Sequence, residues 1–174
     1  NECLSVELKA EGKAAAGYLG CYVIGTHKGV TASEACLTKK YNRFKKAFEK
    51  QESEGSCPPP TPDFTARNED TAAFVASIAS SIAVDRCGAN HLKALARLVS
   101  ISMRCVAKFT SGTILSEDIE ACFGREGGAQ WSKYYSPESA CRCERNIQKL
   151  FERTKATEEF VRIQACRLAG IPSL

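Results

Sequence analysis

The spacing of the cysteines is the feature that most restricts what this chain can fold into. Four cysteines from Cys3 to Cys57 are separated by 18, 15 and 21 residues, and four from Cys87 to Cys141 by 18, 17 and 19. Leu-Lys-Ala follows the first cysteine of each set at the same distance, at residues 8–10 and 92–94. The two sets therefore indicate a duplication with a period of about 84 residues.

The number of cysteines also bears on where the protein resides. Ten cysteines in 174 residues predict five disulfide bonds and an oxidising compartment. The chain begins Asn-Glu-Cys without a methionine, so we expect that a signal peptide is removed and that the protein is secreted, periplasmic or on the cell surface. No run of apolar residues is long enough for a membrane span.

Apolar residues at helical spacing predict an all-α fold of about seven helices. The first helix covers residues 3 to about 26 and contains four glycines, which indicate either a close neighbouring helix or local fraying. The second begins at an N-cap, Ser33, and ends at Gly55, and the third begins at about Asn68 or Glu69. Ser116 is the expected cap of the fifth helix. The inward stripe expected for the fourth helix consists of Leu92, Leu95, Val99, Met103 and Val106.

Helix geometry converts the cysteine intervals into a pairing scheme. An α-helix rises about 1.5 Å per residue, so 18 residues span about 27 Å. If the first two helices are antiparallel, Cys21 lies beside Cys36 at the turn, and Cys3 lies beside Cys57 at the open end. Only this nested pairing keeps both Cα separations below about 7 Å.

The same reasoning applies to the second set, although there Cys143 competes with Cys141 for Cys87. It predicts two tandem, disulfide-stapled helical hairpins with covering helices, in units 1–84 and 85–174, and leaves open whether both pack as one domain. The predicted disulfide bonds in the second unit are Cys87–Cys141, Cys105–Cys122 and Cys143–Cys166.

No combination of residues predicts catalysis or a resident cofactor. The chain contains no phosphate-binding loop, nucleophile elbow or HExxH motif, and no Cys-x-x-Cys pair that would indicate a metal site. The two histidines, His27 and His91, are expected to be exposed residues near helix ends. We therefore expect a protein that is not an enzyme and that holds no metal or other cofactor.

Two stretches are candidates for binding a partner. Trp131, Tyr134 and Tyr135 lie where the two copies diverge, and aromatic residues dominate interface energetics; the alternative is that they fill a gap in the core. A basic stretch within residues 39–46 is expected to be a solvated helix face, with an anionic surface or polysaccharide as the alternative partner. A net charge of +4 is too small to indicate nucleic acid.

The first hairpin also resembles a known type of repeat. Its Cys-x17-Cys-x14-Cys-x20-Cys spacing is combined with Leu-Lys-Ala-x-Gly-Lys at residues 8–13 and Phe-Lys-Lys-Ala-Phe-x-Lys at residues 44–50. This pattern is similar to a cysteine-rich helical-hairpin repeat of predicted secreted proteins from myxobacteria and related deltaproteobacteria. The resemblance covers residues 3 to about 84 well and implies a secreted, disulfide-stapled helical module, without catalytic residues.

These observations favour a non-enzymatic secreted structural or interaction protein. We expect it to be a component or accessory subunit of an extracytoplasmic or surface assembly, with other protein subunits as partners. One alternative is a carrier that holds a lipid or another small apolar ligand between the helices. A further alternative is a protease inhibitor or toxin-like binder that would use an exposed loop from Pro58 to Arg67.

Overall fold

The computed structural model describes residues 2–54, 57, 64–82, 84, 86–125 and 155–161. Within these residues every regular element is a helix, which confirms the all-α prediction. The main helices are α1 (Glu2–His27), α2 (Glu34–Ser53), α3 (Phe64–Ser80) and α4 (Arg86–Thr110). A short 3-10 helix, Ser116–Asp118, leads into helical residues 119–125, and residues 155–161 are also helical.

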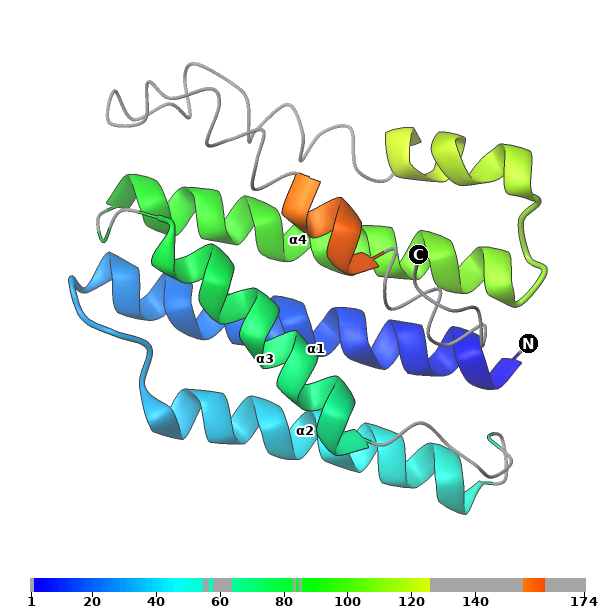
Figure 1. Cartoon of the computed structure of the whole chain (residues 1–174), viewed down its shortest axis with the longest axis horizontal. Helices are drawn as coiled ribbons and strands as arrows, with labels where there is room; N and C mark the ends of the chain where they lie inside the picture. The colour runs from blue at the N-terminus through cyan, green and yellow to red at the C-terminus, as the bar shows by residue number, and fades with distance from the viewer. Residues whose placement is uncertain are drawn as a thin grey trace.

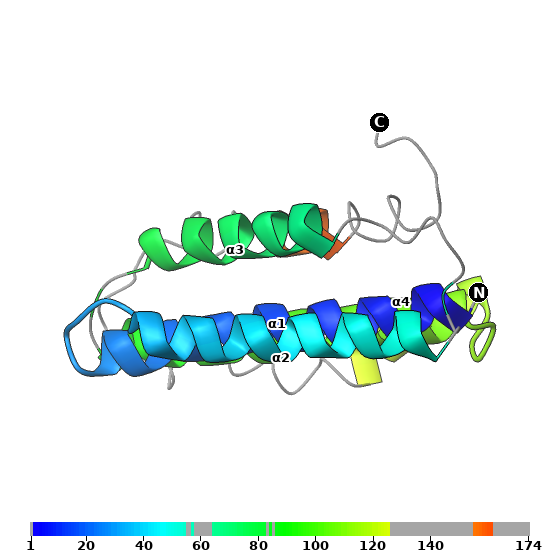
Figure 2. The ribbon, with the colours of Figure 1, turned by 90° about the horizontal axis from the view of Figure 1, so that it is seen from below.

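Three of the helices form one layer with α1 in the middle. Figure 1 shows α2 on one side of α1 and α4 on the other, and α1 runs antiparallel to both. Figure 2 shows this layer from its edge, with α3 lying across one face. Residues 155–161 lie on the same face as α3, where the rings of Phe74 and Phe160 stack with centroids 4.1 Å apart. Helix α1 is therefore enclosed by α2, α4 and α3.

The two sequence units contribute to one hydrophobic core. A single cluster of buried apolar side chains includes residues from all four main helices and from residues 155–161. Leu8 and Leu19 of α1 are completely buried, as are Leu92 and Val99 of α4. The stripe predicted for α4 is confirmed, because all five of its members are buried.

Two glycines of α1 are explained by what lies against them. A Cβ atom at Gly12 would lie 2.6 Å from the Cβ of Met103, so glycine at this position allows α4 to approach closely. A Cβ atom at Gly25 would lie 2.7 Å from the carbonyl oxygens of Val30 and Thr31, in the turn that follows α1. Of the two explanations that the sequence left open, close packing therefore holds at these two positions.

Both predicted disulfide bonds of the first hairpin are confirmed. Cys21 and Cys36 join α1 to α2 near their turn, with a Cα separation of 5.8 Å. Cys3 and Cys57 join the other end, with a Cα separation of 4.8 Å. The hairpin is thus closed covalently at both ends, and α1 and α2 cannot separate without breaking a bond.

One disulfide bond of the second unit is also confirmed. Cys105 of α4 and Cys122 of the helical residues 119–125 have a Cα separation of 5.9 Å. The other predicted pairs involve side chains outside the described residues, namely Cys87–Cys141 and Cys143–Cys166.

Helix α3 begins earlier than the sequence pattern indicated. Its first residue is Phe64 instead of Asn68 or Glu69. The ring of Phe64 packs against α2, with its centroid 5.1 Å from that of Phe44 and 5.5 Å from that of Phe48. This tertiary contact stabilises a first turn that the apolar periodicity of α3 does not include.

Of the two helix caps predicted from the sequence, one is confirmed and the other is wrong. Ser33 caps α2 as predicted, and its hydroxyl accepts a hydrogen bond from the backbone N–H of Cys36. Ser116 is not a cap; it lies inside the 3-10 helix, and Leu115 holds the cap position. The backbone N–H of Leu115 donates to the carboxylate of Asp118, so an acidic residue of the first turn closes this end.

The glycine packing leads to a matched pair of substitutions in α1. We expect Gly12→Ala to lower the free energy of unfolding by about 1–3 kcal/mol, because its methyl group overpacks against Met103. A Cβ atom at Gly20 would have no neighbour within 4 Å, so Gly20→Ala should raise the free energy of unfolding by about 0.5–1 kcal/mol. Chemical denaturation of both variants measures the difference, and effects of the same sign would contradict the close approach of α4.

The disulfide bonds lead to a second expectation. The bonds close loops of 54 and 15 residues, which corresponds to about 4 and about 3 kcal/mol of stabilisation. Replacing Cys21 and Cys36 together by serine should therefore lower the free energy of unfolding by about 3 kcal/mol. Reductant should lower the melting temperature of the unchanged protein by more than this double substitution does. A melting temperature that reductant does not change would contradict a stabilising role for the crosslinks.

Candidate functional site

The feature of the described surface that most favours binding is a group of positive charges on α2 and α1. We call it the cationic face, and it consists of Lys13, Lys39, Lys40, Arg43 and Lys46. Lys39, Arg43 and Lys46 are separated by four and three residues, so they form one stripe along α2. The buried side chains of this helix, Phe44 and Phe48, belong to the hydrophobic core.

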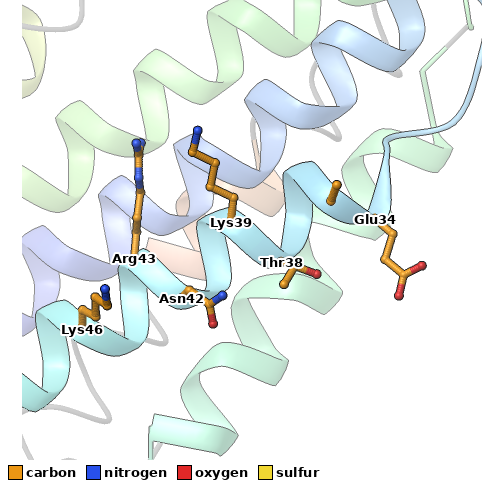
Figure 3. Close-up of a pocket in the computed structure, with 7 residues that line it drawn as sticks. Glu34, Thr38, Lys39, Asn42, Arg43 and Lys46 are labelled. Carbon is orange, nitrogen blue, oxygen red and sulfur yellow. The ribbon is translucent and has the colours of Figure 1, made fainter.

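The cationic face contains two adjoining hollows that share Arg43. The first is an open hollow along α2, in which Thr38 and Asn42 lie beside Lys39, Arg43 and Lys46. Figure 3 shows the side chains of Lys39 and Arg43 extending toward α1, whereas Glu34 points away from them. The hollow is therefore lined by three cationic groups and two neutral hydrogen-bonding groups, with the carboxylate of Glu34 at one end.

The second hollow is a groove of about 250 Å³ between α1 and α2. Its charged residues are Lys13 of α1 and Lys40 and Arg43 of α2, and small residues and Phe44 complete its lining. A Cβ atom at Gly17 would lie 3.1 Å from the Cδ of Lys40, so glycine leaves space for the aliphatic part of this lysine against α1. The half-buried Lys40 is thereby held at the groove rather than extended into solvent.

The charges of the cationic face are not neutralised by neighbouring acids. Two other lysines of α2 have such partners: Lys45 lies 3.8 Å from Glu49, and Lys50 lies 3.5 Å from Glu54. Within the part of the chain that the structure describes, the five residues of the cationic face form no ion pair. Their charge is therefore available to an anionic partner.

A second polar cluster lies on the other face of the layer and is buried. Arg67 of α3 is 5% exposed and lies between two carboxylates of α1, Glu7 (2% exposed) and Glu11 (0%). Its Nη2 is 3.3 Å from Glu7, and its Nη1 donates to Glu11 at 3.3 Å. The hydroxyl of Thr71 donates to the other oxygen of Glu11 at 3.2 Å, and the Arg67 guanidinium lies 5.4 Å from the centre of the Phe48 ring. This cluster fixes the position of α3 on α1.

Burial raises the pKa of two side chains of α1. Burial raises the pKa of Glu7 above its ordinary value of 4.5; Arg67 opposes this rise and Glu52 of α2 adds to it. Burial, followed by the influence of Tyr41, raises the pKa of Tyr18 to about 12. Tyr18 therefore stays protonated, and its hydroxyl donates to the side-chain oxygen of Asn68 on α3.

One group of potential metal ligands occurs near this cluster but does not form a metal site. Sulfur atoms of Cys3 and Cys57 and a carboxylate oxygen of Glu7 lie within 4.8 Å of one another. Both sulfurs are joined in a disulfide bond, whereas a cysteine binds a metal as a thiolate.

Among the described helices, none is long and apolar enough to cross a membrane.

The structure describes only some of the residues that the sequence singled out. Trp131, Tyr134 and Tyr135 lie outside the described residues. His27 is an exposed helix-end residue as expected, but the expectation was wrong for His91, which is 4% exposed and lies inside α4. The reason is that His91 follows the same buried face of α4 as its apolar neighbours.

The buried ionic cluster was not among the sites expected from the sequence. Glu7 and Glu11 are one helical turn apart, and they alternate with the buried Leu4, Leu8 and Ala14. Charged residues inside an apolar arc are the signal that could have revealed them. Their partner, Arg67, follows the proline-rich stretch 58–62, and nothing in its local sequence indicates burial.

The raised pKa of Glu7 predicts a pH dependence that one substitution should remove. A folded-state pKa above the ordinary 4.5 means that the folded protein binds this proton more tightly than the unfolded chain does. The contribution of Glu7 to stability is therefore fully present below pH 4.5, and it is lost as the pH rises from there through the raised pKa. Glu7→Gln keeps an oxygen for Arg67 and carries no charge, so its stability relative to the unchanged protein should increase with pH above 4.5.

Two further variants serve as comparison. Glu49→Gln changes an exposed ion pair, and we expect it to alter the free energy of unfolding by less than about 0.5 kcal/mol at every pH. Arg67→Met leaves both buried carboxylates without their cation and should cost about 3–5 kcal/mol. Denaturation between pH 4.5 and 8.5 measures all three, and a constant difference between Glu7→Gln and the unchanged protein would contradict the raised pKa.

The comparison with known proteins gives no match. No protein-family model, curated protein or solved structure matches this chain. The function is therefore inferred from the residues of the chain itself, and among the described residues the cationic face is the strongest candidate for a functional site.

Proposed function

We propose that this chain is a non-enzymatic secreted structural or interaction protein, and that it acts as a component or accessory subunit of an extracytoplasmic or surface assembly. We further propose that it joins its partner through the cationic face. The observation that carries the proposal is a group of five cations that form no ion pair with any described residue, on a helical hairpin closed by disulfide bonds at both ends.

The covalent bracing supports an interaction role outside the cytoplasm. Disulfide bonds form and persist in oxidising compartments, and three are present among the described residues. A hairpin that cannot open also holds its surface groups in place before the partner arrives. Less conformational entropy is then lost on binding, which favours affinity.

The cationic face also has the composition of a binding surface rather than that of an ordinary charged helix surface. On an ordinary surface, acids and bases alternate and form pairs, as Lys45 and Lys50 do with Glu49 and Glu54. Here five cations without an ion pair among the described residues line two hollows, and the aliphatic part of Lys40 lies in the space that glycine leaves at position 17. The positive charges, the two hollows and the fixed side chain of Lys40 therefore occur together on one surface.

A carrier function has less support in the described residues. A cleft of about 270 Å³ lies between α1, α2 and α3, and it is lined in part by Tyr18, Tyr41 and Val75. Ligand pockets commonly have volumes of about 300–1,000 Å³, and a lipid needs the upper part of this range. Completely buried side chains such as Leu8 and Leu92 fill the centre of the core.

The inhibitor or toxin alternative loses one of its candidate residues. Arg67 was expected at the end of an exposed loop, but it belongs to α3 and is 5% exposed. Its guanidinium is engaged by Glu7 and Glu11 and does not reach the surface as a recognition residue.

Native purification of the full secreted chain, followed by mass measurement, tests the proposal. We expect a particle larger than the 18.9 kDa chain, which higher salt dissociates. Arg43→Gln combined with Lys46→Gln should dissociate this particle. Lys45→Gln combined with Lys50→Gln is the matched control, because it removes the same charge from the same helix at residues that already have acidic partners.

The other outcomes contradict the proposal in distinguishable ways. A monomer that carries a stoichiometric apolar molecule would replace it with the carrier function. A particle that both double variants weaken equally would show that net charge, and not the cationic face, holds it together. A lone monomer without a ligand at low salt would also contradict an assembly role.

A further inference from the structure

We propose that the cationic face binds a linear acidic polysaccharide through the sulfate or carboxylate groups of its sugars. This inference rests on the proposed function, because it names the chemical class of the partner for the same surface. It is carried by the arrangement of the cations, by the shape of the two hollows and by the neutral polar groups beside them.

The cations are arranged as a linear polymer requires. Lys39 and Lys46 are seven residues apart on α2, which corresponds to about 10.5 Å along the helix axis. Arg43 lies between them on the same stripe, and Lys13 and Lys40 lie toward α1, in the groove. A chain with an anionic group on successive sugars would meet a cation at each turn of α2.

The hollows favour a polymer with projecting acidic groups over a flat surface. Lys13, Lys40 and Arg43 surround a groove of about 250 Å³ whose other residues are mainly alanine and glycine. A sulfate or carboxylate that enters this groove is flanked by residues carrying three positive charges. A flat lipid surface would contact the rim of the groove and leave its interior unused.

The neutral groups beside the cations match the hydroxyl groups of sugars. Thr38 and Asn42 lie in the open hollow with Lys39, Arg43 and Lys46. Their hydroxyl and amide groups both donate and accept hydrogen bonds, as sugar hydroxyl groups do. A polysaccharide offers hydroxyl and acidic groups on the same unit, and the hollow offers the complement of both.

Two other classes of polyanion fit this surface less well. The exposed large apolar residues within the described part of the chain do not line either hollow, so the face has nothing to insert into a membrane; they are Ile24, Val30, Tyr41, Val84, Phe109 and Leu115. Proteins that bind single-stranded nucleic acid usually stack its bases on aromatic side chains. The aromatic residue that lines the groove, Phe44, is 3% exposed and offers no such platform.

Binding to immobilised heparin and to polygalacturonate tests the inference, with neutral dextran as the blank. Heparin carries sulfate and carboxylate groups, whereas polygalacturonate carries only carboxylate, so the two probes identify which acidic group is recognised. At about 0.15 M salt we expect binding to at least one of them and none to dextran. The logarithm of the affinity should fall linearly as the logarithm of the salt concentration rises, because bound counterions are released.

The double variants described above locate the site. Arg43→Gln with Lys46→Gln should weaken binding about tenfold, since each surface ion pair contributes about threefold. The control pair Lys45→Gln with Lys50→Gln should weaken it less than about twofold, because those charges already face Glu49 and Glu54. Arg43→Lys with Lys46→Arg keeps the charge and should retain binding. All these side chains are exposed, and circular dichroism verifies that each variant is folded.

Three results would overturn the inference. These are absence of binding to both acidic polysaccharides, equal loss in the two double variants, and tighter binding to phosphatidylserine vesicles or duplex DNA than to either polysaccharide. If the native particle depends on the cationic face while both polysaccharides fail to bind, the inference falls and the proposed function stands. If neither the particle nor the polysaccharides depend on this face, both fall.

Discussion

The contact of one buried guanidinium with two buried carboxylates determines how the helices of this protein can be arranged. Glu7 and Glu11 occupy the middle helix of the layer, where neither is more than 2% exposed. Isolated carboxylates at such positions would be very unfavourable, so the helix that covers them must supply a cation. Arg67 does so from α3, and Thr71 satisfies a further carboxylate oxygen. The placement of α3 on this face follows from that requirement, and the opposite face of α1 and α2 carries the exposed cationic face.

The remaining packing follows from the close contact between α1 and its two neighbours. Disulfide bonds close the α1–α2 hairpin at both ends, whereas α4 packs on α1 through buried apolar side chains, with Met103 against Gly12. Helix α1 therefore packs against both α2 and α4. The cysteine intervals predict two hairpins in sequence, whereas the buried residues of α1 and α4 form one cluster.

The cysteine pairing could be predicted because it depends on length alone. Antiparallel helices of known rise bring Cys21 to Cys36 and Cys3 to Cys57, whatever packs around them. The start of α3 and the burial of His91 could not be predicted in this way, because they depend on contacts with other helices. The basic stretch of α2 was recognised, yet the sequence favoured an ordinary solvated surface. The structure shows that Lys45 and Lys50 pair with Glu49 and Glu54, whereas Arg43 and Lys46 have no acidic partner among the described residues.

The like charges on α2 repel one another, and this repulsion lowers the stability of the helix. Lys39 and Arg43 are four residues apart, and Arg43 and Lys46 three, so their repulsion destabilises α2 by about 0.2–0.5 kcal/mol for each pair. A glutamate one helical turn away from each cation would offset the repulsion, as Glu49 does for Lys45 and Glu54 does for Lys50. The two crosslinks that close this hairpin contribute about 3 and about 4 kcal/mol, several times the repulsion. The crosslinks therefore do more than resist unfolding. They offset the repulsion between cations that have no acidic partner among the described residues, as the proposed binding of an anionic partner requires.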